Sequence, residues 1–147
     1  MTAIASNIKH RIKTDLEALV TAGTLKEVQV DDFKTSPVFD RNIGAYPCAI
    51  VTGPAIEGTS FTNHDNIRTH TFAVVVLAKI EDIAADDTVE TLVETILDKF
   101  DNDATLGGYA NAGLEPASTV PEPVTINSNS YIYFTVVLKA KAIKQLS

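Results

Sequence analysis

The chain has 147 residues, of which 45% are hydrophobic and 21% charged, so its size and composition fit one globular domain and exclude a disordered chain. Its formal net charge of -7 argues against a general nucleic-acid-binding protein, because such proteins carry a basic surface. Cys48 is the single cysteine, which excludes an internal disulfide framework, and its apolar neighbours predict a small buried side chain.

The N-terminal segment predicts an amphipathic helix and no signal peptide. Charges interrupt this segment early, and no apolar run approaches the roughly 18 residues of a membrane helix, so we expect a soluble protein made in the cytoplasm. The apolar face of the helix comprises Ile4, Ile8, Ile12, Leu16, Leu19 and Val20. Thr2 is the expected N-cap, and Gly23 is expected to end the helix. Three basic residues are expected on a solvated face: Lys9, Arg11 and Lys13.

Strand signals dominate the next part of the chain. "LKEVQVDDF" predicts a short strand, and "YPCAIVTGPAIEG" predicts a buried strand that ends in a turn at Gly53-Pro54. The polar segment Glu57–Asn66 is either a loop or the tip of a long hairpin.

"RTHTFAVVVLAKI" predicts a strand that is apolar on both faces, with Phe72, Val74, Val76, Ala78 and Ile80 on one face and Ala73, Val75 and Leu77 on the other. Such a strand is covered on both faces, by its own fold or by a partner chain, and for residues 73–77 we favour the chain's own core.

A second helix is predicted over residues 86–101, with a stripe of Val89, Leu92, Val93, Ile96, Leu97 and Phe100. Asp87 and Glu90 have capping-box spacing. Nine acidic residues and one base, Lys99, lie between Glu81 and Asp103, a pattern typical of a solvated face.

The C-terminal part predicts strands. "SYIYFTVVLKAKAIK" has an apolar face and a mixed face, and the mixed face includes Tyr131, Tyr133 and Val137. The proline-interrupted "EPASTVPEPVTINSN" predicts an edge strand or a loop. We therefore expect one α+β domain spanning residues 1–147, with a mixed, mainly antiparallel sheet flanked by the N-terminal helix and the central helix.

"DKFDNDATLGGYANAG" begins as the end of a helix and continues as a glycine-rich loop, and such a loop can bind phosphate or calcium. Gly107 and Gly108 follow a helix, whose C-terminus repels anions, and no lysine comes next, which disfavours a phosphate loop. Counted from Asp101, the loop lacks the glycine and the glutamate of an EF-hand. We predict that Gly107 and Gly108 form a structural turn.

Other candidate constellations are equally weak. His64 and His70 would share one side of a strand, but no further Cys or His cluster completes a zinc site. The chain has no G-x-S-x-G motif, and Cys48 has no histidine near it in sequence. We therefore predict a protein that is not an enzyme, with no catalytic residues, no metal ligands and no cofactor.

The order of segments between residues 67 and 143 is informative. Arg68 precedes a strand that contains Phe72, an acidic helix runs to Phe100, the turn "DATLGG" follows, and the strand-rich tail ends in "YFTVVLKAKAI". This order resembles tail terminator (tail completion) proteins of long-tailed bacteriophages, and the N-terminal helix fits as well. Each motif is short, so the likeness depends on their order and spacing.

The resemblance implies a mechanical function. Such proteins form a ring, usually hexameric, on the head-proximal end of the tail tube, where they stop tube growth and present a docking face to a head-tail connector or neck protein. DNA passes through the lumen without sequence-specific binding, and the protein is part of the virion after assembly in the host cytoplasm. Because a ring subunit needs self-complementary surfaces, Tyr131, Tyr133 and Val137 are candidate subunit-interface residues.

Two alternatives remain open. Another head-tail joining protein, such as a neck or stopper component, would bind the portal or adaptor, whereas a terminator binds tail tube ends. A small enzyme or ligand-binding domain would instead show a concave pocket with convergent polar groups.

Overall fold

The computed structural model describes residues 4–30, 43–60, 65–79, 86–126 and 128–145. The elements in chain order are α1 (Ile4–Thr21), β1 (Glu27–Val30), β2 (Cys48–Ser60), β3 (Asp65–Lys79), α2 (Asp86–Asp101), β4 (Gly113–Ser118), β5 (Glu122–Ile126) and β6 (Asn129–Gln145). The α+β fold with a mixed, mainly antiparallel sheet is confirmed. The expected N-cap Thr2 and the strand residue Ile80 lie outside the described residues.

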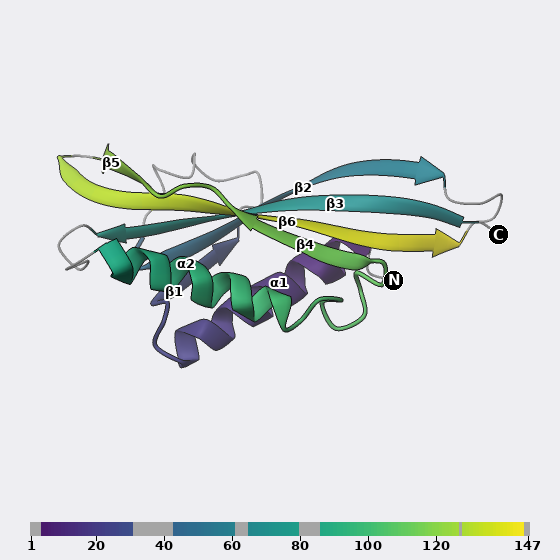
Figure 1. Cartoon of the computed structure of the whole chain (residues 1–147), viewed down its shortest axis with the longest axis horizontal. Coiled ribbons are helices and arrows are strands. Elements are labelled where there is room, and N and C mark those ends of the chain that lie inside the picture. The colour runs from purple at the N-terminus through teal and green to yellow at the C-terminus, as the bar shows by residue number, and fades with distance from the viewer. Residues whose placement is uncertain (1–3, 31–42, 61–64, 80–85, 127, 146–147) are drawn as a thin grey trace.

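The six strands form one sheet in the order β1-β2-β3-β6-β4, with β5 pairing with β6 beyond β4. β1 runs parallel to β2, and all the other pairs are antiparallel. β3 and β6 form the centre of the sheet and stay in one register from Asp65↔Gln145 to Lys79↔Tyr131. The proline-interrupted segment is thus two short strands, β4 and β5, laid end to end along the free side of β6 (Figure 1).

Both helices lie on the same side of the sheet, so this face is covered (Figure 1). The predicted apolar stripes supply the contact, because residues three and four apart in a helix share a face. The resulting core is fully buried and includes Ile8, Ile12 and Leu16 of α1, Ile96 and Phe100 of α2, and Phe72 and Phe134 of the sheet. Gly23, with φ 87°, ends α1 as predicted, and the Thr24 amide donates to the Leu19 carbonyl at 2.9 Å.

The expected turn at Gly53-Pro54 is wrong. The strand β2 continues through both residues to Ser60, with a bulge between Thr52 and Ala55. Gly53 has φ 112°, and a Cβ there would lie 2.9 Å from the Thr71 carbonyl oxygen, so the bulge requires glycine. A Gly-Pro pair therefore bends this strand without ending it, and the segment that follows is the end of a long hairpin.

Candidate functional site: the open sheet face and the loop after α2

Within the described residues, both helices lie on the first face of the sheet and none lies on the second. Register places Ala73 opposite Val137, Val75 opposite Thr135 and Leu77 opposite Tyr133, so the mixed face of β6 lies beside the second apolar face of β3. We call this side the open face. Part of the open face is buried, and its buried residues form a smaller core cluster: Cys48, Ile50, Leu77 and Tyr131.

Tyr131, one of the three candidate interface residues, belongs to this smaller cluster. It is 8% exposed, and its ring stacks on Tyr46 with a centroid distance of 5.1 Å. The pKa of Tyr46 is raised to about 12, mainly by burial and to a smaller extent by a hydrogen bond between the two tyrosines. The ammonium of Lys79 lies 5.3 Å from the centre of the Tyr46 ring. The chain itself therefore packs Tyr131, which leaves little of it for a partner.

Tyr133 and Val137, the other two candidates, are only half-buried. The Tyr133 hydroxyl donates to Oε2 of Glu122 in β5 at 3.2 Å, and this hydrogen bond raises the pKa of Tyr133. Val137 pairs with Ala73 on one side and Ala117 on the other. Together with Val75, these small side chains form the open-face patch: Ala73, Val75, Ala117 and Val137.

Lysines border the open-face patch toward the end of β6. Lys139 is exposed, and Lys141 forms an ion pair with Glu115 of β4 at 2.9 Å. The hydrogen bond from Lys141 and the positive charge of its ammonium lower the pKa of Glu115. An apolar patch with a polar border is one kind of surface that can bind another protein.

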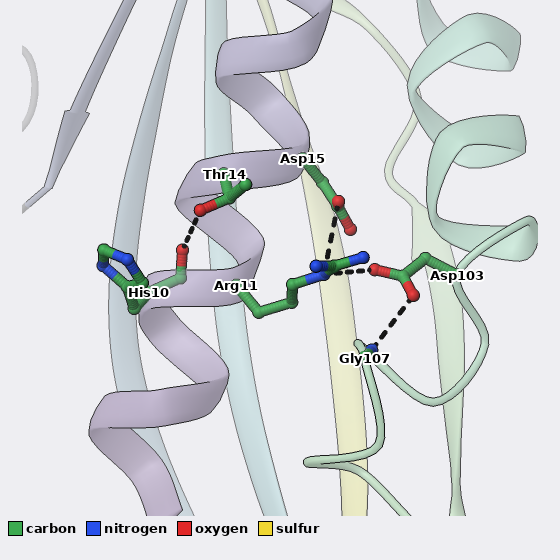
Figure 2. A network of polar contacts seen from close by, with 6 residues as sticks. All are labelled: His10, Arg11, Thr14, Asp15, Asp103 and Gly107. Carbon is green, nitrogen blue, oxygen red and sulfur yellow. Dashed lines mark hydrogen bonds and ion pairs between the residues drawn. The ribbon is translucent and has the colours of Figure 1, made fainter. Parts of the chain in front are cut away.

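The loop after α2 is a compact turn fixed to α1 (Figure 2). Gly107 and Gly108 have φ of 68° and 95°, and Leu106 also has a positive φ of 48° while its side chain is fully buried. Asp103 fixes the turn, because its Oδ1 accepts the Gly107 amide at 3.0 Å. The two glycines thus occupy backbone conformations that other residues adopt only with strain.

Arg11 connects this loop to α1 (Figure 2). Its Nε donates to Asp103 Oδ2 at 2.8 Å and lies 3.6 Å from Asp15 Oδ1. Asp15 is 4% exposed, and its Oδ2 is buried without a hydrogen-bond partner. Burial and the neighbouring Asp103 raise the pKa of Asp15 to about 7, although Arg11 opposes the shift. When it is protonated, Asp15 can donate to Asp103, which removes the repulsion between the two carboxylates.

The expectation that Lys9, Arg11 and Lys13 lie on one solvated face is therefore wrong for two of them. Arg11 binds Asp103, and the Lys9 ammonium donates to the Gly53 carbonyl of β2 at 2.9 Å. The four-residue spacing of Arg11 and Asp15 was a visible signal of an ion pair. Nothing local in the sequence indicates Asp103 as the third member, because it lies 92 positions from Arg11.

Two of the remaining candidate residues, Cys48 and His70, are buried. Cys48 is fully buried, as predicted, and His70 is 3% exposed with no hydrogen-bond partner for either ring nitrogen. His64 lies outside the described residues. Within the parts of the chain that the structure describes, no three His, Cys, Asp or Glu side chains are placed to hold a metal ion, and no helix is long and apolar enough to cross a bilayer.

One shallow hollow of about 260 Å³ lies beside the start of α2, lined by Val89, Glu90, Pro121, Glu122, Pro123 and Ile132. Its walls are about half apolar and half polar, and its two carboxyl residues are Glu90 and Glu122. Comparison with known proteins adds no identification: the chain matches no protein-family model and no curated protein sequence.

Proposed function

We propose that the protein is a tail terminator of a long-tailed bacteriophage, which forms a ring on the end of the tail tube. The observation that carries the proposal is the open face: the two described helices share the other side of the sheet, and Val137 and Tyr133 stay half-exposed on its longest strand. A ring subunit has two neighbours and a tube to contact, and such a face is suited to burial in that assembly.

The order of elements supports the proposal. β3, α2, the glycine turn and the strands β4 to β6 follow one another as in the phage family that the sequence resembles. The turn is also consistent with a structural role, because Asp103 accepts the Gly107 amide within it and binds Arg11 of α1. The acidic excess of the chain suits a lumen along which DNA slides by repulsion.

The test combines light scattering of the purified protein with electron microscopy after mixing with tail tubes. Rings, or monomers that cap tube ends, support the terminator. Binding to portal or adaptor in place of tubes supports a neck or stopper component. A monomer that ignores both would overturn the proposal in favour of a small enzyme or ligand-binding domain.

A charged residue at Tyr133 sharpens this test. Tyr133→Glu should reduce ring formation or tube capping much more than thermal stability, because the side chain is half-buried on the open face. Ser130→Glu is the control, since it places the same charge at an exposed site on the same strand. Normal assembly of Tyr133→Glu would show that the open face is not an interface.

A further inference from the structure

The two helices on the covered face carry opposite charges on their outer sides. Their inner sides are identified by contact: Arg11 of α1 reaches Asp103 at the end of α2, and the charge of Lys99 in α2 acts on Asp15 of α1. α1 packs against β1 and β2, and α2 packs against β4, so the outer sides of the two helices lie toward opposite edges of the sheet.

The outer side of α1 is basic. The ammonium of Lys9 binds the carbonyl of Gly53 in β2, so this side lies over β2. Lys13 is one turn further along and therefore lies on the same side, with the exposed His10 next to it. No acidic residue lies among these turns, and Glu17, one turn beyond Lys13, is the first acidic residue on that side. We call Lys9, His10 and Lys13 the basic flank.

The outer side of α2 is acidic. Glu90, Glu94 and Asp101 are exposed and recur at four- and seven-residue spacing, which places them in one stripe. We call these three residues the acidic flank. Near its start lies the hollow formed with Pro121 and Pro123, which precede and enter β5. A recess with both apolar and carboxylate walls suits the alkyl chain and ammonium of a lysine.

We propose, resting on the assignment of the chain as a ring-forming protein, that the basic flank of one copy docks against the acidic flank and adjacent hollow of the next copy. A second copy is the occupant because both surfaces belong to one chain and are complementary in charge. They lie at opposite edges of the same helical layer, so the contact is head-to-tail and repeats from copy to copy, as a ring requires.

Two further features favour this contact. Copies with a net charge of -7 repel one another, so association requires a local arrangement in which basic groups meet acidic ones. Pairing between sheet edges is disfavoured on the β4 and β5 side, because Pro116 and Pro123 lack backbone donors there. The flanks of the helical layer are therefore expected to contribute to the contact between copies, in addition to the open face.

The test uses two charge-reversed proteins. One carries His10→Glu and Lys13→Glu in the basic flank, and the other carries Glu90→Lys and Glu94→Lys in the acidic flank. Each alone should associate at least tenfold more weakly than the wild type, measured by sedimentation or by capping of tail tubes, because like charges meet. All four changed positions lie on the helix exteriors, so melting temperatures should stay close to that of the wild type.

An equimolar mixture of the two proteins gives the decisive readout. In a head-to-tail ring of alternating copies, each reversed basic flank meets a reversed acidic flank, and each unchanged flank meets an unchanged one. Assembly should therefore return to near the wild-type level in the mixture alone. Ala18→Glu, an exposed change on the side of α1 opposite to Lys9, is the control and should assemble normally.

The outcomes separate the two proposals. If wild-type protein forms rings or caps tubes while both reversed proteins do so equally well, the flank contact is wrong and the terminator function stands. Loss of assembly without recovery in the mixture also overturns the contact. If wild-type protein neither associates nor caps tubes, the terminator proposal fails, and the flank contact fails with it.

Discussion

The two faces of the sheet differ in what buries them. On the covered face, Phe72, Phe134 and their neighbours lie under two helices and are fully buried. On the open face, Leu77 and Tyr131 are buried, but the patch around Val137 stays half-exposed. Because burial of apolar area is the main favourable term in folding, the covered face should supply most of the stability of the isolated chain. The open face therefore keeps apolar area that is accessible to a partner.

The largest expected effect comes from the covered face. Phe134→Ala should lower the free energy of unfolding by about 3–5 kcal/mol, because it removes a ring that is 1% exposed and leaves a cavity. Val137→Ala, three positions along the same strand, should cost about 1 kcal/mol or less because its side chain is half-buried. Urea unfolding of both variants measures the difference. Equal losses would contradict the contrast between the two faces.

The next effect concerns the turn between α2 and β4, which contains Gly107 and Gly108. Gly107→Val and Gly108→Val should each lower stability by about 1–3 kcal/mol, because both positions have positive φ. Gly107→Val should be the worse change, since a Cβ there lies 3.4 Å from the Arg11 guanidinium, whereas nothing lies within 4 Å of one at Gly108. Thermal unfolding measures both.

Ala104→Val in the same exposed turn is the control, because this residue has no positive φ and should lose little stability. Unchanged melting temperatures in both glycine variants would remove the argument that the turn requires these residues.

Much of this fold follows from local patterns in the sequence. The stripes of α1 and α2 and the alternation of β6 predicted those elements and their buried faces, because residues on one face repeat with the period of the element. The Gly53-Pro54 pair misled the prediction because it is a bulge signal and a turn signal alike. Only the neighbouring strand, whose Thr71 carbonyl approaches Gly53, distinguishes them.

The candidate site was less predictable because it depends on contacts between distant residues. The alternation of β6 indicated a half-polar face that holds Tyr131, Tyr133 and Val137, but it did not distinguish which of the three the chain itself buries. Stacking on Tyr46 is what separates Tyr131 from the others. The ion pair of Arg11 and Asp103 likewise forms only when the fold brings α1 beside the end of α2.

A smaller effect should appear in the pH dependence of stability. The pKa of Asp15 is raised from its ordinary value of 3.8 to about 7, so the native protein holds a proton that the unfolded chain releases. This contribution to stability is full below pH 3.8 and is lost as the pH rises through about 7. Because the site relaxes on ionisation, we expect a loss of about 1–2 kcal/mol.

Asp15→Asn tests this assignment. The amide mimics the protonated carboxyl and can donate to Asp103, so the loss of stability with rising pH should disappear. Glu17→Gln, an exposed change two residues away, should keep the wild-type dependence. Chemical unfolding at a series of pH values compares the three proteins, and an unchanged slope in Asp15→Asn would contradict the role of this carboxyl.

The smallest effect is a gain, and it also comes from the covered face. His70 is buried opposite Ala140, and neither of its ring nitrogens has a hydrogen-bond partner, so His70→Leu should stabilise the protein by up to about 1 kcal/mol at neutral pH.

Burial and the charge of Arg68 lower the pKa of His70 from 6.5, so the unfolded chain binds a proton there before the native one does. Stability from this residue is therefore lost as the pH falls below 6.5, the opposite direction to Asp15. In the wild type the two slopes oppose each other across the acid range, and His70→Leu should unmask the fall in stability with rising pH that Asp15 causes. His10→Leu, at an exposed site, should leave the slope unchanged, and a flat profile in His70→Leu would show that Asp15 does not titrate as described.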